Sequence, residues 1–247
     1  QESRHPPALA NDKVGEQRVL PHSVCEVAPT GPSVVAQRNG AARSSSPARP
    51  GSFDGKRLVA YLERRKTFSI KVTLDGCVDH QEGIADDETH AFFTRLMDEG
   101  GAMLWGRVTY EMMESYWPAV ARGDEEAPPA MREWAVKLEA KPKYVVSSTR
   151  KDFPWTNSHH IAGDLRTAVQ QLKDETPTGV LLGSGKLATE LDRLDLIDEY
   201  KFLVHPRIAG HGPTLYQSGL PSTRRLELVS AKPLRSGAVA MHYRRAR

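Results

Sequence analysis

The chain has 247 residues, of which 39% are hydrophobic, and its formal net charge is +3. This length predicts one or two domains, and the small charge, without a block of Lys and Arg interleaved with aromatics, argues against a nucleic-acid partner. The apolar runs fall short of the roughly 18 residues that a membrane span needs, and Cys25 and Cys77 suit neither a disulfide framework nor a thiolate metal site. We expect a cytoplasmic protein with no membrane partner and no metal.

Residues 1–56 differ in composition from the rest of the chain. They are rich in Pro, Gly, Ser and Ala and show no sustained period of 2 or 3.6 residues. Such a segment buries too little apolar surface to offset the entropy lost on ordering. The sequence therefore predicts a disordered N-terminal extension over 1–56 and one folded domain over 57–247.

Strand and helix patterns alternate along this folded part. The predicted strands are 67–76, 102–105, 143–148, 158–163, 179–182 and 199–206. The predicted helices are 86–99, 106–117, 128–140, 164–175 and 185–194. This alternation predicts an α/β fold with a mostly parallel sheet that is covered on both faces. The last two segments, 224–234 and 237–246, read as an antiparallel hairpin that makes the sheet mixed.

A glycine-rich turn, "GSGKLA" at 183–188, follows one predicted strand and opens a helix. It is not an ATP-binding P-loop, because Leu187 stands where a hydroxyl must hold magnesium and Val180 where the first glycine belongs. Gly183, Gly185 and Ala188 match a dinucleotide fingerprint, but the turn lies late in the chain. The alternative interpretation is a tight strand-to-helix connection in which the glycines only allow the turn and bind no ligand.

Two further turns follow predicted strands, where open sheets of this kind bind ligands. Arg107 and Thr109 begin one helix, and Ser147, Ser148 and Arg150 share the turn at the end of the predicted strand 143–148. A guanidinium fork and several hydroxyls suit a phosphate monoester, although a helix cap and a solvated charge would also explain Thr109 and Arg107. After this turn no acid appears until Asp152, which favours NADPH over NADH.

Taken together, the segments "VTLDG", "GRVTYE", "VVSST", "LLGSGKLATEL", "LIDEY" and "VHPRIAGHGPTLY" resemble the dihydrofolate reductase-like family. The chain is most similar to the C-terminal reductase domain of the bifunctional deaminase-reductase of riboflavin biosynthesis and to its stand-alone bacterial relatives, over about 65–245. The resemblance implies a dihydrofolate reductase-like three-layer fold, NADPH lying across the strand ends, and a homodimer. The P-C-x-x-C zinc signature of the deaminase half is absent from the sequence.

The resemblance also implies the residues of the site. Those implied to bind NADPH are Gly106, Arg107, Val108, Thr109, Ser147, Ser148, Arg150, Gly183, Ser184, Gly185, Lys186 and Leu187. Thr73 and Gly76 are implied to lie near the small-molecule substrate. Asp87 is a further candidate for this role, although the helix dipole also favours an acid at the start of a helix. Asp75 is the candidate proton donor for catalysis, although Asp-Gly is also a common turn dipeptide.

The expected activity is an NADPH-dependent reduction of a C=N or C=O bond in a pterin- or pyrimidine-like heterocycle. The uracil reductase step of riboflavin biosynthesis, on 5-amino-6-(5-phosphoribosylamino)uracil, is the nearest such reaction. The alternative is a non-catalytic NADPH-binding or sensor protein on the same fold, because a fold alone does not fix a function.

Overall fold

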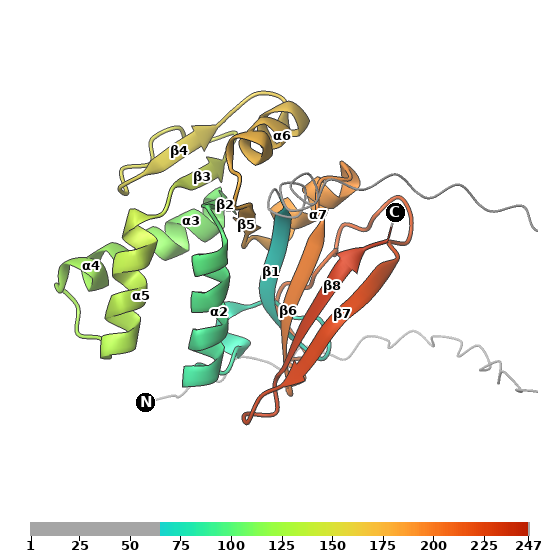
Figure 1. The fold of residues 1–247 in the computed structure, drawn as a ribbon, viewed down its shortest axis with the longest axis horizontal. Coiled ribbons are helices and arrows are strands. Elements are labelled where there is room, and N and C mark those ends of the chain that lie inside the picture. Colours follow the sequence, from blue (N-terminus) through green and yellow to red (C-terminus); the bar gives the residue numbers. More distant parts are fainter. Residues whose placement is uncertain (1–64, 247) are drawn as a thin grey trace, which may run out of the picture. The chain divides into compact units, whose positions relative to one another are not determined.

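The structure, a computed structural model, describes residues 65–246 (Figure 1). The predicted extension over 1–56 and its boundary with the folded domain at 57 lie outside these residues. Within them, one mixed sheet runs through the domain with helices on both of its faces.

The strands of the described part follow the order β4-β3-β2-β5-β1-β6-β8-β7. Neighbours from β4 to β6 pair in parallel, and β8 pairs antiparallel with both β6 and β7. The strands are β1 (Lys66–Thr73), β2 (Ala102–Gly106), β3 (Lys143–Val146), β4 (Ser158–Ile161), β5 (Val180–Leu182), β6 (Glu199–His205), β7 (Leu226–Pro233) and β8 (Val239–Arg245). The predicted mostly parallel sheet with a C-terminal antiparallel hairpin is confirmed.

The α-helices follow the predicted pattern with one exception, and the short 3-10 helix η1 was not predicted. The helices are η1 (His80–Glu82), α2 (Asp87–Glu99), α3 (Arg107–Glu114), α4 (Trp117–Arg122), α5 (Pro129–Ala140), α6 (Leu165–Glu175) and α7 (Gly185–Arg193). The single helix predicted over 106–117 was wrong, because the chain breaks between α3 and α4 at Ser115 and Tyr116. Pro118 lies in the first turn of α4 and has no N–H to continue the α3 hydrogen bonds.

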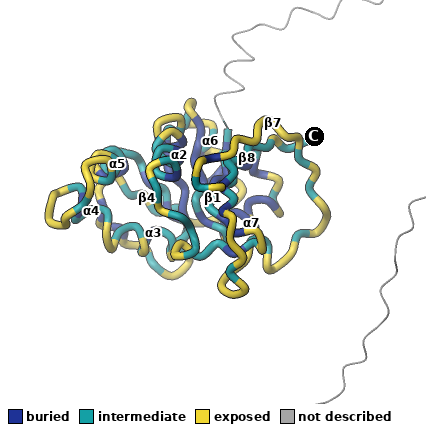
Figure 2. Tube along the Cα trace, turned by 90° about the horizontal axis from the view of Figure 1, so that it is seen from below, coloured by how far each residue is buried: buried dark blue, intermediate teal, exposed yellow. Residues whose placement is uncertain are grey.

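The central strands are apolar on both faces, which is why helices cover both. On β2, Met103 and Trp105 pack against α2, α3 and α5, and Leu104 packs against α6 and α7 on the opposite face. The first cluster includes Leu96 of α2, and the second includes Leu191 of α7. Figure 2 shows the buried segments in the middle of the domain and the exposed ones along its outer loops and helix surfaces. This arrangement is the predicted three-layer α/β/α fold.

Candidate functional site

The sheet order brings the predicted turns to one edge. β3, β2, β5 and β1 are consecutive neighbours and run parallel, so their carboxyl ends lie side by side. The turns that leave these ends carry Ser147–Arg150, Gly106–Thr109, Gly183–Leu187 and Thr73–Gly76, in that order along the sheet. Segments that are far apart in the sequence therefore share the edge at which open α/β sheets bind ligands.

The hydroxyl of Ser184 joins two of these turns. Its Oγ accepts a hydrogen bond from the Gly106 N–H at 3.0 Å and donates to Thr109 Oγ1 at 2.7 Å. Ser184 is the N-cap residue of α7 but makes no cap bond to that helix, and α3 likewise has no side-chain cap. The capping role considered for Thr109 is not seen. Two helix N-termini are thus held side by side with no side chain capping them; α4 and α5 also have no side-chain cap, and α2 and α6 are capped by Asp86 and Asp164.

Packing accounts for one glycine of the 183–188 turn. A Cβ atom on Gly183 would lie 3.1 Å from the Trp105 indole nitrogen, closer than side chains normally approach. Trp105 is buried in the core, so it has little room to move. Leu187 is also a core residue, at 7% exposure, so only its main chain is available to a ligand. Lys186 is exposed on the first turn of α7.

The two arginines of the site are both paired with acids of α3. Arg107 Nη1 lies 2.7 Å from Glu111 Oε2, and Arg150 makes a two-pronged pair with Glu114 at 2.8 and 3.1 Å. Glu111 Oε1 also lies 3.6 Å from Arg150 Nη1. The sequence argument considered only the acids that follow the serine turn, up to Asp152, and so missed these two acids of α3. The helical spacing could have indicated these acids, because Glu111 and Glu114 lie four and seven residues after Arg107 and so share its face of the helix.

The serine turn is organised by its own first hydroxyl. Ser147 Oγ accepts the N–H groups of Thr149 and Arg150, at 3.2 and 2.9 Å, and the Ser147 carbonyl lies 2.9 Å from His160 Nε2. Ser148 is exposed at the tip of this turn. The Ser147 hydroxyl therefore fixes the shape of the turn, and the Ser148 side chain faces solvent.

Asp75 at the end of β1 is held by three donors. Its carboxylate accepts the Thr73 hydroxyl and the N–H groups of Ala209 and Gly210, the last two at 3.1 and 2.7 Å. These bonds, led by the one from Thr73, lower the pKa of Asp75 to about 2. The carboxyl is therefore ionised at neutral pH and fastens the loop after β6 to the end of β1. This geometry favours the turn-forming interpretation of Asp75 over that of a proton donor.

The remaining predicted substrate residues lie near this same strand end or at the start of α2. Thr73 is buried, at 3% exposure, and its hydroxyl is engaged with Asp75 and with the Cys77 N–H. Gly76 has a φ of +85°, the left-handed conformation that favours glycine. Asp87 is exposed in the first turn of α2.

Large apolar side chains are exposed at the carboxyl edge. Leu74, Val108 and Ile208 are 65%, 65% and 77% exposed, and they follow β1, β2 and β6. The sequence pointed to Val108 alone among these three. Apolar surface that flanks polar turns is suited to the ring systems of a small ligand.

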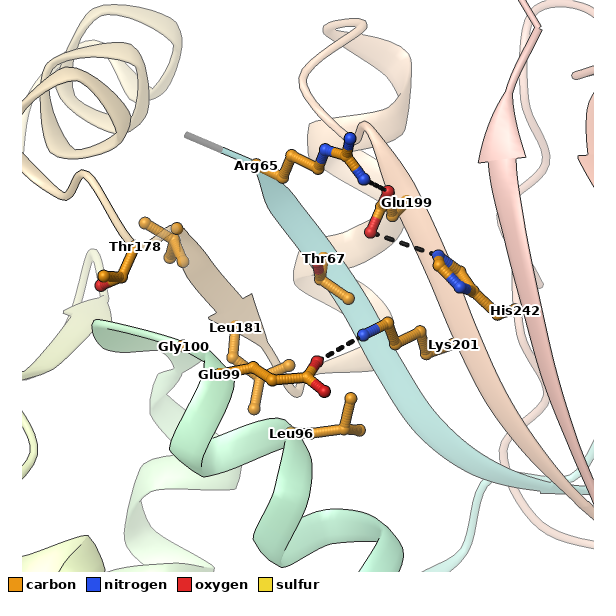
Figure 3. A pocket seen from close by; sticks show the side chains of 12 residues that line it. Arg65, Thr67, Leu96, Glu99, Gly100, Thr178, Leu181, Glu199, Lys201 and His242 are labelled. Atoms are coloured by element: carbon orange, nitrogen blue, oxygen red, sulfur yellow. Dashed lines mark hydrogen bonds and ion pairs between the residues drawn. The ribbon is translucent and has the colours of Figure 1, made fainter. Parts of the chain in front are cut away.

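A cavity of about 360 Å³ lies at the opposite edge, where β1, β5 and β6 begin (Figure 3). None of the predicted site residues lines it. Its charged side chains satisfy one another, because Arg65 and His242 pair with Glu199 and Lys201 lies 2.7 Å from Glu99. The lining therefore offers no surplus positive charge to a phosphate group.

The comparison with known proteins identifies the family. Residues 66–240 match the model of the RibD C-terminal domain. The chain belongs to the RibD C-terminal domain family. This confirms the resemblance seen in the sequence, and the dihydrofolate reductase-like fold class with it.

The chain is also similar to a curated relative and, in fold, to solved structures. The uncharacterized protein YyaP of Bacillus subtilis is 26% identical over 185 residues, which cover 73% of this chain and 95% of the relative. A pyrimidine reductase-like protein from Corynebacterium diphtheriae has a TM-score of 0.54 at 14% identity, covering 80% of this chain and 96% of that one. The diaminohydroxyphosphoribosylaminopyrimidine deaminase/5-amino-6-(5-phosphoribosylamino)uracil reductase of Thermotoga maritima also has a TM-score of 0.54, at 17% identity. The match covers 77% of this chain and 59% of the Thermotoga protein.

Two features are absent from residues 65–246. None of the helices there is long and apolar enough to cross a membrane. No group of three or more His, Cys, Asp or Glu side chains among those residues is arranged to hold a metal ion.

Proposed function

We propose that this chain is a nicotinamide-dependent reductase that uses NADPH to reduce a pterin- or pyrimidine-like heterocycle. The observation that carries the proposal is the pair of uncapped helix N-termini, α3 and α7, joined through the Ser184 hydroxyl at the carboxyl edge. Membership of the RibD C-terminal domain family and the names of the two similar structures support the same reaction class.

The residues at this edge fit such a cofactor. Uncapped N–H groups and the positive ends of two helix dipoles favour a diphosphate. Lys186 adds positive charge at the same edge, Arg107 and Arg150 add guanidinium hydrogen-bond donors, and Val108 adds exposed apolar surface. A bound nicotinamide cofactor supplies the hydride, and the protein supplies orientation and electrostatics.

The chain's own residues then hold and shape the site. Ser184 fixes the distance between the α3 and α7 turns, because one hydroxyl bonds to both Gly106 and Thr109. Asp75 fastens the loop after β6 over the end of β1. With a pKa of about 2 it stays ionised at neutral pH, so the proton that follows the hydride reaches the substrate from water or from another group.

The first experiment measures cofactor binding by isothermal titration calorimetry and thermal denaturation. NADPH at about 100 times its Kd should raise the free energy of unfolding by about 2.7 kcal/mol. Ser184→Ala should weaken NADPH about fivefold, because it removes a net stabilisation of about 1 kcal/mol between the two turns. Ser218→Ala, in an exposed loop, is the matched control. If the wild-type chain binds no nicotinamide cofactor, the proposal is wrong.

A second experiment separates an enzyme from a sensor. The full chain is incubated with NADPH and a panel of pterin and pyrimidine heterocycles, and absorbance of the reduced cofactor is followed. Consumption that depends on one heterocycle supports the reductase. Tight NADPH binding without consumption across the panel would favour the non-catalytic alternative.

A further inference from the structure

Two arginines and two glutamates form a charge-balanced cluster beside the serine turn. Arg107 pairs with Glu111, Arg150 pairs with Glu114, and Glu111 lies between the two guanidinium groups. The four side chains are between 22% and 41% exposed, so water screens them only in part. Two positive and two negative charges leave this part of the edge with no net charge.

The guanidinium of Arg150 has other supports besides Glu114. Its Nε donates to the Asp152 carbonyl at 2.7 Å, and its Cζ lies 5.2 Å from the ring centres of both Tyr110 and Phe153. Stacking on aromatic faces and a main-chain bond hold the group where it is. Loss of the Glu114 charge would therefore free the positive charge of Arg150 without removing the side chain from its position.

We infer that Glu111 and Glu114 limit how strongly this chain prefers a 2′-phosphorylated nicotinamide cofactor, by neutralising Arg107 and Arg150. This inference rests on the proposed function. A 2′-phosphate carries between one and two negative charges and meets two carboxylates along with the guanidinium groups it needs. The 2′-hydroxyl of NADH meets no such repulsion, because a hydroxyl can donate a hydrogen bond to a carboxylate.

The experiment compares Kd values for NADPH and NADH by calorimetry, in the wild-type chain, in Glu111→Gln, in Glu114→Gln and in the double variant. Glutamine keeps the size and the helix propensity of glutamate while removing the charge. We expect the double variant to bind NADPH about tenfold more tightly and NADH no more tightly than the wild type does. Arg150→Ala should shift the preference the other way.

The control is Glu133→Gln, which removes the same charge from an exposed position on α5 and should leave the ratio of the two Kd values unchanged. The gain in NADPH affinity should also shrink as salt rises from 0.05 to about 0.5 M, because exposed charges are screened. The inference would be overturned if the double variant binds both cofactors with the same ratio of Kd values as the wild type. The proposed function would still stand in that case. A wild-type chain that binds neither cofactor would overturn both.

Discussion

The carboxylate of Asp192, near the end of α7, is fully buried and collects donors from three other parts of the chain. It receives hydrogen bonds from Tyr200 on β6, Tyr216 and Arg224 in the loop after β6, and Arg245 on β8, at 2.8 to 3.4 Å. Burial raises the pKa values of both tyrosines, and the Asp192 charge raises them further, so their hydroxyls stay protonated. Four donors on one carboxylate join α7 to the C-terminal third of the domain.

Replacing this carboxylate by an amide should destabilise the domain strongly. Asp192→Asn keeps the shape of the side chain but removes the negative charge that balances Arg224 and Arg245, whose side chains are 17% and 10% exposed. Breaking a buried pair in this way costs about 3–5 kcal/mol. Asp195 also contacts Arg245 and is itself 64% exposed, so we expect the low end, about 3 kcal/mol. That is a large share of the roughly 5–15 kcal/mol that stabilises a typical domain.

The assay is urea unfolding of the full chain at pH 7, followed by circular dichroism and tryptophan fluorescence. Asp195→Asn is the matched control, because it makes the same chemical change three residues later on a carboxylate that is 64% exposed, and it should cost less than about 1 kcal/mol. A loss below about 1 kcal/mol for Asp192→Asn would refute the reasoning. It would mean that the arginines and tyrosines find equivalent partners without this charge.

Two further predictions concern other side chains with shifted pKa values. Asp75→Ala should speed hydrogen exchange at the Ala209 and Gly210 amides at pH 7, and unchanged exchange rates would contradict the role given to Asp75. Because the folded-state pKa of Asp75, about 2, lies below the ordinary 3.8, the wild type should lose this protection only as pH falls from about 4 toward 2. Lys143 is buried and donates to three carbonyls at the end of α5, so Lys143→Met should cost about 2–3 kcal/mol in urea unfolding at pH 7. Burial lowers the pKa of Lys143 from 10.5 to about 8, so the unfolded chain binds more protons than the folded chain between pH 8 and 10.5. Lys143 therefore makes the free energy of unfolding rise with pH over this range, and the Met variant should lack this rise.

The order of strands and helices could be predicted because each element carries its own pattern. Strands β2 and β5 are short apolar runs, and helices such as α6 show apolar residues at helical spacing. The covered, mostly parallel sheet follows from that alternation. The break between α3 and α4 was missed because apolar spacing continues across it, and one proline decides the geometry.

The site could be predicted only as a set of turns. Each turn is readable from its glycines, hydroxyls and arginines, but the bond from Ser184 to Gly106 joins residues 78 positions apart. Such a contact depends on β5 lying next to β2, which local sequence does not specify. The pairing of Arg150 with Glu114 depends likewise on how α3 lies over the turn after β3. Contacts between residues far apart in the sequence therefore determine the geometry of the site, which local sequence patterns could not predict.

The short helix α7 links stability to the candidate site. With nine residues it is too short to be stable alone, so its position is set by what it packs against. Leu187 and Leu191 bury one face of the helix, and Asp192 fixes its far end to β6 and β8. Its first turn is the one that Ser184 joins to Gly106. We therefore expect the geometry of the proposed diphosphate site to depend on Asp192, a buried carboxylate two helical turns away.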